Sequence, residues 1–454
     1  MSDEARVAAV IEERAGELVE LASELIAFDT TTRGESDGPA RAEAALQERL
    51  AGLLRDAGAE VELFEPEPGA LDRWTRQVPE GLGFAGRPQL VARLGGAGDG
   101  RSLLLNGHID VVSAEPRGRW ASDPFEPEVR DGRLYGRGAC DMKGGVAAMV
   151  MAVLALAESG IELGGELIVS TVTDEEWNGA GALALAARGI EADAGIVPEA
   201  TGFEPWIACR GVLNPTVTVQ GRPGHAEMPQ PDWREGGAVN AIEKTTVVLD
   251  AVRALRERWG ERDGDHPLLA PGELIPTVIK GGEWWVNYPA SCTTVIDVTY
   301  LPAQGDPDGA WGEGLEREIE TWILERARTD EWLAEHPPTL TWGTNLAPAE
   351  IPADHPIVAC ALGAGEAVGR PGRAAALQGW HDAATFTRFG TPTISYGPAG
   401  LSNDGETMAH AVDEFVPVAD LVACAQALAI AALRWCGGEG DVETMATREA
   451  KETI

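Results

Sequence analysis

Histidine and carboxylate side chains recur at the ends of short apolar runs in this chain of 454 residues. The first case is the segment LLLNGHIDVV, residues 103–112, which carries His108 and Asp110 two positions apart. Residues i and i+2 of an extended chain point to the same side, so these two side chains should share a face. A carboxylate beside an imidazole can hold one ring nitrogen and leave the other for a metal ion or a proton. By itself, however, the pair is better explained as a hydrogen-bonded closure of a strand, so further ligands must come from elsewhere.

Four further segments place an acid or a histidine where an apolar strand ends or a loop begins. They are GRGACDMKGG (136–145) with Asp141, TDEEWNG (173–179) with Glu175 and Glu176, VPEATG (197–202) with Glu199, and ETMAHAVDEF (406–415) with His410. Each has a simpler structural explanation, such as a helix N-cap for Asp141, a solvated helix start for the glutamate pair, or an ordinary loop residue. Their joint occurrence at strand ends argues against separate explanations. Ligands of open α/β sheets bind beyond the carboxyl ends of strands, so we expect these side chains to converge.

The converging set would suit two divalent metal ions. It comprises two imidazoles and three carboxylates, those of His108, Asp141, Glu176, Glu199 and His410. Zinc is the default ion for such ligands, and cobalt or manganese are alternatives. If one carboxylate bridges two ions, each ion keeps one histidine and one terminal carboxylate. Glu175 is then left over beside a ligand, which is the position that a general base requires.

The elements that must position these residues alternate between helices and strands. Apolar periodicity predicts helices over 5–28, 38–57, 143–158 and 179–189, and strands over 90–94, 102–112, 165–176 and 194–200. This alternation predicts an α/β fold with a mixed, largely parallel sheet.

The pattern changes after Arg210. Strands are predicted over 212–221, 272–282, 290–301 and 339–343, with helices over 236–259 and 312–328. Their order, β-α-β-β-α-β, is the ferredoxin-like pattern. Past Pro348 the α/β pattern resumes, with a helix near 355–368, a strand over 391–397 and a helix over 417–436. We therefore expect a first part of one domain over 1–209, an inserted α+β domain over 210–347, and the second part of the first domain over 348–454.

Composition limits the classes of binding partner and the cellular compartment that we expect for this protein. The chain has 73 acidic and 36 basic residues, a formal net charge of −37, so no basic stripe is expected for nucleic acid or an anionic membrane. No apolar run reaches the length of a membrane span, and the acidic start of the chain has no export signal. Six cysteines without CxxC spacing fit reduced thiols in a cytoplasm.

Together, these segments resemble a dinuclear zinc deacylase and peptidase family that includes aminoacylase, acetylornithine deacetylase, succinyl-diaminopimelate desuccinylase and carboxypeptidase G. The segments that carry the resemblance are GHIDVV, GRGACDMKGG, DEE, VPEATG, GHAEMP and AHAVDEF, and the resemblance covers nearly the whole chain. It implies a zinc-peptidase-like catalytic domain with an inserted lid and dimerisation domain. It also implies the ligand roles: His108 and Glu199 on one zinc, Glu176 and His410 on the other, and Asp141 as the bridge. Glu175 would be the general base, and Asp110 would orient His108.

The resemblance adds residues outside this set. It implies that His225, in GRPGHAEMPQP, reaches the active site from the lid, often from the partner subunit of a homodimer, and donates to the developing oxyanion. Asp382 matches a family aspartate near the site, whereas His381 stands where a small polar residue is usual and is a candidate substrate contact.

The lid also departs from the family pattern. The family commonly has Asn-x-x-Pro followed by Asp-x-Arg, whose Asn and Arg bind a substrate carboxylate, but Val286 and Thr299 stand at those two places. Asn287, a candidate substrate contact, is one position off and would point to the other face of the strand. Either a basic residue such as Arg210 or Arg222 binds a carboxylate by another route, or the substrate has no carboxylate there. Trp284 and Trp285 could line an apolar pocket wall, a core or a dimer interface.

The sequence therefore predicts a cytoplasmic, metal-dependent hydrolase that cleaves the amide bond of a small molecule, an N-acyl amino acid or N-acyl amine. Alternatives on the same centre are a dipeptidase or carboxypeptidase, a carbamoyl or ureido hydrolase, and an enzyme that removes a ring amino group. A non-catalytic binding protein is disfavoured, because all five ligands and Glu175 are present.

Overall fold

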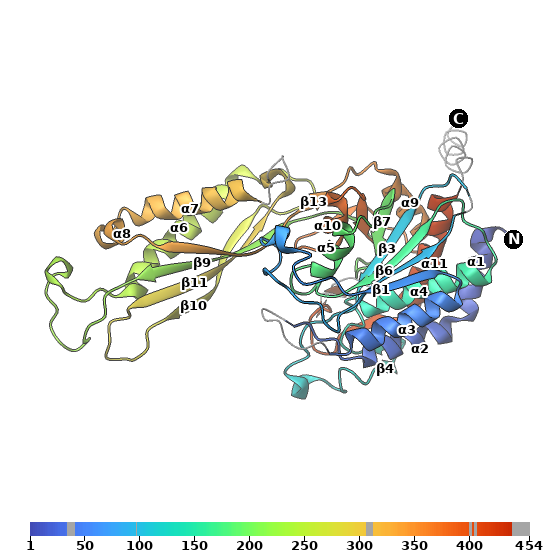
Figure 1. The fold of residues 1–454 in the computed structure, drawn as a ribbon, viewed down its shortest axis with the longest axis horizontal. Coiled ribbons are helices and arrows are strands. Elements are labelled where there is room, and N and C mark those ends of the chain that lie inside the picture. The colour runs from blue at the N-terminus through green and yellow to red at the C-terminus, as the bar shows by residue number, and fades with distance from the viewer. Residues whose placement is uncertain (34–40, 97, 306–311, 399–401, 404–405, 438–454) are drawn as a thin grey trace. The chain divides into compact units, whose positions relative to one another are not determined.

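A computed structural model describes residues 1–33, 41–96, 98–305, 312–398, 402–403 and 406–437 of the chain. It divides into two compact units (Figure 1). The first unit comprises Met1–Ala208, Glu350–Ala376 and His381–Ile454, and the second comprises Cys209–Ala349 and Leu377–Trp380. The chain passes between the units at Ala208/Cys209 and at Ala349/Glu350, whereas the predicted domain boundaries are 209/210 and 347/348. The short segment Leu377–Trp380, which joins the second unit, was not anticipated.

The first unit is built on a mixed nine-stranded sheet. Its strands lie in the order β1 (Glu60–Phe64), β2 (Gln89–Leu94), β6 (Leu167–Val172), β3 (Leu103–His108), β7 (Ala194–Val197), β15 (Thr393–Ser395), β8 (Trp206–Cys209) and β13 (Ala349–Glu350), with β14 (Ala375–Leu377) paired to β8. The central strands β6, β3, β7 and β15 are parallel to one another, whereas β1 and β2 are antiparallel. Strands β3, β6 and β7 are buried along their whole length, which explains their unbroken apolar sequences.

Helices cover both faces of this sheet. The helices α4 (Lys143–Glu158) and α11 (Val418–Cys436) pack against each other and against β3, and α1 (Asp3–Glu13), α2 (Ala15–Ala27), α3 (Glu43–Asp56) and α9 (Pro356–Ala367) surround them. On the other face, α5 (Ala180–Ala187) and α10 (Ala383–Arg388) enclose a core with β2, β3 and β6. Two apolar layers around a parallel sheet give the α/β class that the sequence predicts.

Helix boundaries differ from the sequence prediction mainly at the start of the chain. The helix predicted over 5–28 is two helices that meet at Arg14. The first of them packs mainly against α11 and the second mainly against α4. The predicted helix over 38–57 begins at Glu43, while α4 has the predicted bounds.

The sequence prediction that no apolar run reaches the length of a membrane span is corrected by helix α11, which is long and apolar enough, by length and composition, to cross a membrane. Within the described residues, however, 61% of the most apolar 18-residue segment of this helix is buried. It packs against α4, α9 and α1, which is the behaviour of a central core helix.

The second unit is a four-stranded antiparallel sheet with two long helices. Its elements are β9 (Gly211–Gln220), α6 (Ala241–Arg262), β10 (Glu273–Gly281), β11 (Ser291–Tyr300), α7 (Glu313–Ala327), α8 (Glu331–Glu335) and β12 (Thr339–Leu346). The sheet order is β10-β11-β9-β12, the ferredoxin-like arrangement that the order of the predicted elements indicates. Alternate residues of β9 and β11 are buried under α6 and α7, around Trp259 and Tyr300.

Candidate metal centre and general base

Neighbouring parallel strands deliver the predicted ligands to one edge of the first unit's sheet. His108 ends β3, the Glu175–Glu176 pair follows β6, and Glu199 follows β7. Because β3 runs parallel to both β6 and β7, their carboxyl ends lie at the same edge. Asp141 joins them from the turn between β5 (Arg133–Tyr135) and α4.

The first possible ligand group consists of His108, Asp141 and Glu199. Their candidate ligand atoms all lie within 4.8 Å of one another. The His108 Nε2 atom is 3.1 Å from Asp141 Oδ1 and 3.7 Å from Glu199 Oε1. The His108 side chain is fully buried. Burial alone would lower its pKa, but the hydrogen bond with Asp141 and the charges of the surrounding carboxylates outweigh burial and raise the pKa well above its ordinary value.

The second possible ligand group consists of Asp141, Glu176 and His410. The His410 Nε2 atom is 3.0 Å from Glu176 Oε2 and 3.5 Å from Asp141 Oδ2. His410 lies in the loop before β18 (Phe415–Pro417), and half of its side chain is exposed. Asp141 thus belongs to both groups and presents one oxygen to each, which is the geometry of a carboxylate between two ions.

Close approach of helix α4 shapes this cluster. A Cβ atom added at Gly145 would lie 1.9 Å from the carbonyl oxygen of Pro198, immediately before Glu199. Only glycine lets the first turn of α4, which follows Asp141, pass so near the backbone that carries Glu199. The second glycine of the DMKGG segment is therefore a packing requirement of the site.

Glu175 lies beside the first group without being part of it. Its Oε2 atom is 3.9 Å from His108 Nε2, and its side chain is 11% exposed. Burial raises the pKa of Glu175 well above its ordinary value, and the nearby charges of Asp382 and Glu199 add to that rise. A carboxyl with a raised pKa beside the ligands has the properties that a general acid–base residue needs.

The interaction between Asp110 and His108 differs from the prediction. His108 Nδ1 is 2.9 Å from the main-chain carbonyl oxygen of Asp110, whereas the nearest carboxylate oxygen of Asp110 is 3.7 Å away. The Asp110 carboxylate instead accepts hydrogen bonds from the backbone N–H groups of Glu175 and Glu176, both at 3.2 Å. The carbonyl turns toward the ring because the chain leaves β3 at His108 and no longer alternates regularly. Asp110 therefore orients the histidine through its backbone and the glutamate pair through its side chain.

The cluster as a whole fits bound cations. One oxygen of Glu176, Oε1, is buried and has no hydrogen-bond partner among the described residues. Burial and then the charge of Asp141 raise the pKa of Glu199 to about 8, and burial raises the pKa of Asp382 to about 7. Buried carboxylates are costly unless positive charge compensates them, and two divalent ions among them would supply it.

Sequence reasoning missed a positioning pair, Arg137 and Glu414. The two side chains form a fully buried ion pair. Glu414 Oε1 also accepts the backbone N–H groups of Cys140 and Asp141, at 2.8 and 3.0 Å. Arg137 Nη2 donates to the carbonyl oxygen of His410, at 3.4 Å. The pair thus links the turn of Asp141 to the loop of His410, and its only sequence signal was the position of Glu414 inside the AHAVDEF segment.

His381 and Asp382 lie in the same unit as the centre, but they have different surroundings. His381 is buried, its Nδ1 is 2.5 Å from Ser395 Oγ, and burial lowers its pKa to about 3. Asp382 is fully buried, and both carboxylate oxygens are without a hydrogen-bond partner among the described residues. Its charge contributes to the raised pKa of Glu175, so it lies near the centre. A substrate contact by either residue stays a prediction.

The predicted lid residues lie in the second unit. His225 and Asn287 are exposed and form an isolated antiparallel bridge, and His225 Nδ1 accepts the backbone N–H of Glu227 at 3.2 Å. Arg210 is mostly buried, and its guanidinium donates to the carbonyl oxygens of Gln378 and Pro271 at 2.5 and 3.0 Å. Their action on the catalytic centre stays a prediction.

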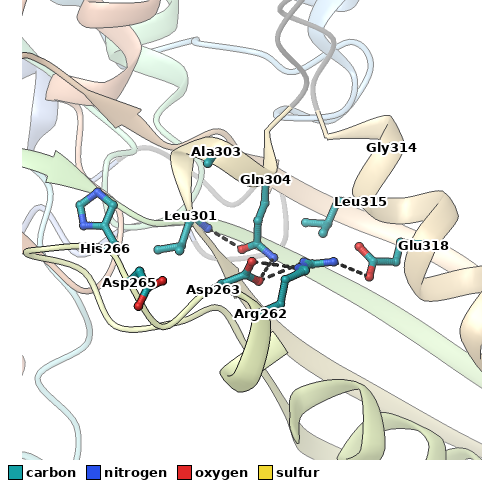
Figure 2. Close-up of a pocket in the computed structure, with 10 residues that line it drawn as sticks. All are labelled: Arg262, Asp263, Asp265, His266, Leu301, Ala303, Gln304, Gly314, Leu315 and Glu318. Atoms are coloured by element: carbon teal, nitrogen blue, oxygen red, sulfur yellow. Dashed lines mark hydrogen bonds and ion pairs between the residues drawn. The ribbon is translucent and has the colours of Figure 1, made fainter. Parts of the chain in front are cut away.

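A cavity of about 450 Å³ in the second unit is separate from these residues (Figure 2). Leu301, Gln304 and three acidic side chains are part of its lining, and none of the predicted site residues is. Its Arg262 already bonds to Asp263 at 2.9 Å and to Glu318 at 2.9 Å, as the dashed lines in Figure 2 show. Arg262 is therefore already engaged by acidic side chains of the cavity wall.

The fold and the cluster at its strand ends define a metal-dependent hydrolase that acts on amide C–N bonds of small molecules. A sequence profile of peptidase family M20/M25/M40 matches residues 104–434, well over half of the chain, so the protein belongs to this family. Members of the family include a dinuclear metal-binding peptidase from Bacillus subtilis.

Two curated relatives have named activities. The N-formyl-4-amino-5-aminomethyl-2-methylpyrimidine deformylase of Bacillus subtilis is 29% identical over 94% of this chain and 96% of its own length. A succinyl-diaminopimelate desuccinylase of Gluconacetobacter diazotrophicus is 33% identical over 76% of this chain and 84% of its own length.

Solved structures share the fold. A tripeptidase from Staphylococcus aureus superposes with a TM-score of 0.69 at 18% identity, covering 93% of this chain and 98% of that one. Human carnosine dipeptidase 1 superposes with a TM-score of 0.68 at 16% identity, covering 96% and 99%.

Proposed function

We propose that this enzyme removes a small acyl group from an amine that carries no carboxylate beside the scissile amide, with N-formyl amines as the first candidate class. The observation that carries this proposal is the pair Val286 and Thr299, at the two places where the family resemblance calls for carboxylate-binding Asn and Arg. The similar Bacillus subtilis deformylase supports it, because the substrate in its name is an N-formyl aminomethylpyrimidine.

The surroundings of Thr299 support the absence of a carboxylate site. Thr299 lies on β11, opposite Val212 of β9 and Glu273 of β10. Glu273 is ion-paired with Arg256 at 2.6 Å, so neither this pair nor the neutral threonine supplies an uncompensated positive charge for a substrate carboxylate. Burying the carboxylate of a substrate without a positive partner is costly, and proteins usually compensate it with a bidentate arginine.

Both alternative arginines are already engaged within the second unit. Arg210 binds two main-chain carbonyl oxygens, as described above. Arg222 donates to the carbonyl oxygens of Trp233 and Gly237, and its guanidinium lies 5.0 Å from the ring centre of Trp332. Neither guanidinium is held ready for a substrate carboxylate.

The second candidate is hydrolysis of an N-acyl amino acid. It is favoured by the desuccinylase relatives, which are 32–33% identical to this chain. Peptidase activity has weaker support, because two solved peptidases, 18% and 20% identical to this chain, share its fold alone. The carbamoyl, ureido and amino-group alternatives have equally little support.

The catalytic roles follow from the donor set. We assign one ion, zinc by default with cobalt or manganese as alternatives, to His108 and Glu199, and a second to Glu176 and His410, with Asp141 shared. When bound, such ions polarise the scissile carbonyl and lower the pKa of a water molecule. Glu175 takes the proton of the attacking water and returns it to the leaving amine. His225 donates to the oxyanion that forms on the former carbonyl oxygen.

A homodimer would bring His225 to a catalytic centre. His225 follows β9, which leads away from the junction between the units at Cys209. The 10 residues of this extended strand span about 30 Å. It therefore lies at the end of the second unit opposite the junction, and we propose that it serves the partner's centre.

Exposed apolar side chains support an interface on the second unit. Edge strand β10 exposes Val278 and Ile279 at 41% and 55%, and the following hairpin exposes Trp285 at 80%. Apolar clusters of this kind mark interaction surfaces. A cytoplasmic location is proposed from the six cysteines, which have no CxxC spacing and five of which are buried.

Matched substrates test the proposal. The zinc- or cobalt-loaded enzyme should be assayed by mass spectrometry on N-formyl and N-acetyl amines, each paired with the corresponding N-acyl amino acid. We expect kcat/KM for the carboxylate-free member to equal or exceed that of the acid. Thr299→Arg should shift the ratio toward the acid. A wild-type preference for the acid of tenfold or more, about 1.4 kcal/mol, would show that a carboxylate is recognised.

A further inference from the structure

The turn Asp174-Glu175-Glu176 holds the proposed base and one proposed ligand, and it is anchored on both sides. On one side, the Asp110 carboxylate accepts the N–H groups of Glu175 and Glu176. On the other, the Asp174 carboxylate is bound by Arg33, which lies 141 residues earlier in the chain. We propose that Arg33 is a positioning residue that fixes Glu175 and Glu176 for catalysis and metal binding. This inference rests on the roles proposed above for those two glutamates.

The contact between Arg33 and Asp174 is a buried bidentate ion pair. Arg33 Nε donates to Asp174 Oδ1 at 3.0 Å, and Nη2 donates to Oδ2 at 2.6 Å. The side chains are 0% and 1% exposed. A fork of two parallel hydrogen bonds fixes the plane of the carboxylate as well as its position, which a single point charge cannot do.

The guanidinium itself is held rigidly. Its Nη1 atom donates to the carbonyl oxygen of Gly83 at 2.7 Å. It also lies 5.5 Å from the ring centre of Phe84 and 5.7 Å from that of Trp177. Arg33 therefore joins three separate chain segments at the turn, and it cannot follow Asp174 if the turn shifts.

Asp174 requires such an anchor because its backbone is strained. Its φ angle is +68°, in the left-handed region that non-glycine residues seldom adopt. The conformation aims its carbonyl oxygen at the N–H groups of Asn178 and Gly179, at 3.1 and 2.7 Å. Strained residues persist where their surroundings determine them strongly, and they cluster at functional sites.

The segment of Arg33 is also tied to the strand that delivers His108. Thr32 N–H donates to the carbonyl oxygen of Val111 at 2.9 Å, and Thr30 Oγ1 donates to that of Ile109 at 2.6 Å. Arg33 thus couples the position of the Glu175–Glu176 turn to the chain that continues from His108. Through this coupling, the distance between His108 and Glu176, the proposed ligands on the two segments, depends on Arg33.

A matched ion pair in the same unit serves as the control. Arg87 and Glu43 form an equally buried pair in the first unit, with side chains 2% and 0% exposed. Arg33→Lys and Arg87→Lys each keep the positive charge but replace a buried guanidinium, so both should lower the melting temperature. Asp174→Asn probes the other partner of the Arg33 pair.

Cobalt titration separates positioning from stability. Apo full-length variants should be titrated with Co²⁺ and followed by visible absorption, and kcat and KM should be measured at saturating metal on any substrate that the wild type hydrolyses. Arg33→Lys should weaken one Co²⁺ site about 10- to 100-fold, alter its absorption bands, and lower kcat by a similar factor with KM within about twofold. Arg87→Lys should match the wild type in all these properties.

The cobalt measurement decides the inference even if the substrate class proposed above is wrong, because it needs no turnover. If Arg33→Lys does not fold, Asp174→Asn is judged by the same criteria. Positioning by Arg33 is excluded if the variant's Co²⁺ affinity, spectrum and kcat all stay within twofold of those of Arg87→Lys.

Discussion

At the scale of single residues, burial and the neighbouring histidines have opposing effects on the pKa values of the carboxyl groups in the centre. Burial raises the pKa of Glu175 and of Asp110, the latter to about 8. For Asp141, burial acts in the same direction, but the hydrogen bonds from His108 and His410 outweigh it and lower its pKa. The acid that both histidines contact is thus the one that stays ionised most readily, which suits the shared ligand.

The role of Glu175 can be tested by an isosteric change. Glu175→Gln removes the proton acceptor but keeps the size of the side chain, and Glu175 is not required in either ligand group. We expect turnover to fall by about 10²–10⁴-fold, the usual range for lost acid–base catalysis, with metal content and melting temperature unchanged. Glu158→Gln, on the exposed end of α4, should keep full activity. Wild-type turnover in Glu175→Gln would remove this residue from the mechanism.

Metal stoichiometry follows from the shared aspartate. Elemental analysis of fully loaded protein should give about two divalent ions per chain, because the two ligand groups overlap only in Asp141. Chelation should abolish activity, and added zinc or cobalt should restore it. Full activity in metal-free protein would contradict the assignment.

At the scale of elements, the ends of strands and the start of helix α4 position the proposed ligands. These segments pack so closely that little movement is possible. Asp141 precedes α4, and the Pro198-Glu199 segment passes against the first turn of that helix at Gly145. Glu414 holds the backbone N–H of Asp141 from the other side. The position of the shared ligand is therefore set by packing between segments that are far apart in the sequence.

A helix glycine offers a direct test of this packing. Gly145→Ala places a methyl group 1.9 Å from the Pro198 carbonyl oxygen, so α4 or the Glu199 segment must move. We expect a lower melting temperature and at least a tenfold loss of turnover at saturating metal. Gly52→Ala in α3 meets nothing within 4 Å and should instead stabilise by about 0.5–1 kcal/mol with unchanged turnover. Equal effects of the two substitutions in thermal denaturation and in the assay would refute the packing argument.

At the scale of the whole molecule, the question is how the second unit contributes. Its sheet leaves β10 at an edge with both faces largely exposed, and its His225 lies beyond the far end of β9. Both features fit a unit that meets a second copy. They lead to two predictions, one for the site and one for assembly.

Subunit mixing tests whether His225 acts in the partner. His225→Ala should keep its metal and lose about 10²–10³-fold in turnover, the scale of one oxyanion donor. Mixed dimers of His225→Ala and Glu175→Gln chains should regain activity, because one of their two centres would have both residues. If mixed dimers form, as native mass spectrometry can show, and stay inactive, then His225 acts within its own chain or not at all.

A charge on the β10 edge should disrupt assembly. Ile279→Lys places an ammonium group at a side chain that is 55% exposed, and we expect sedimentation analysis to show monomers. Val129→Lys, at a 49% exposed position on β4 (Glu128–Arg130) of the first unit, should stay dimeric. A dimeric Ile279→Lys protein would place the interface elsewhere.

The sequence alone determined the fold class, the order of elements in both units and the family. Those features depend on local patterns: buried parallel strands are continuously apolar, alternating strands are half buried, and strand ends carry the reactive side chains. It also singled out six residues that the structure places around one edge of the sheet, since neighbouring parallel strands end together there. Their roles stay predictions until the substitutions above are made.

Only the tertiary structure decided how those residues are held. Arg33 bonds to Asp174 across 141 positions, and Arg137 to Glu414 across 277, so no local pattern could pair them. The same is true of Asp110, whose carboxylate holds a turn 65 residues later instead of the histidine beside it. The direction of a side chain at a strand end depends on the packing of other segments rather than on the period of the strand.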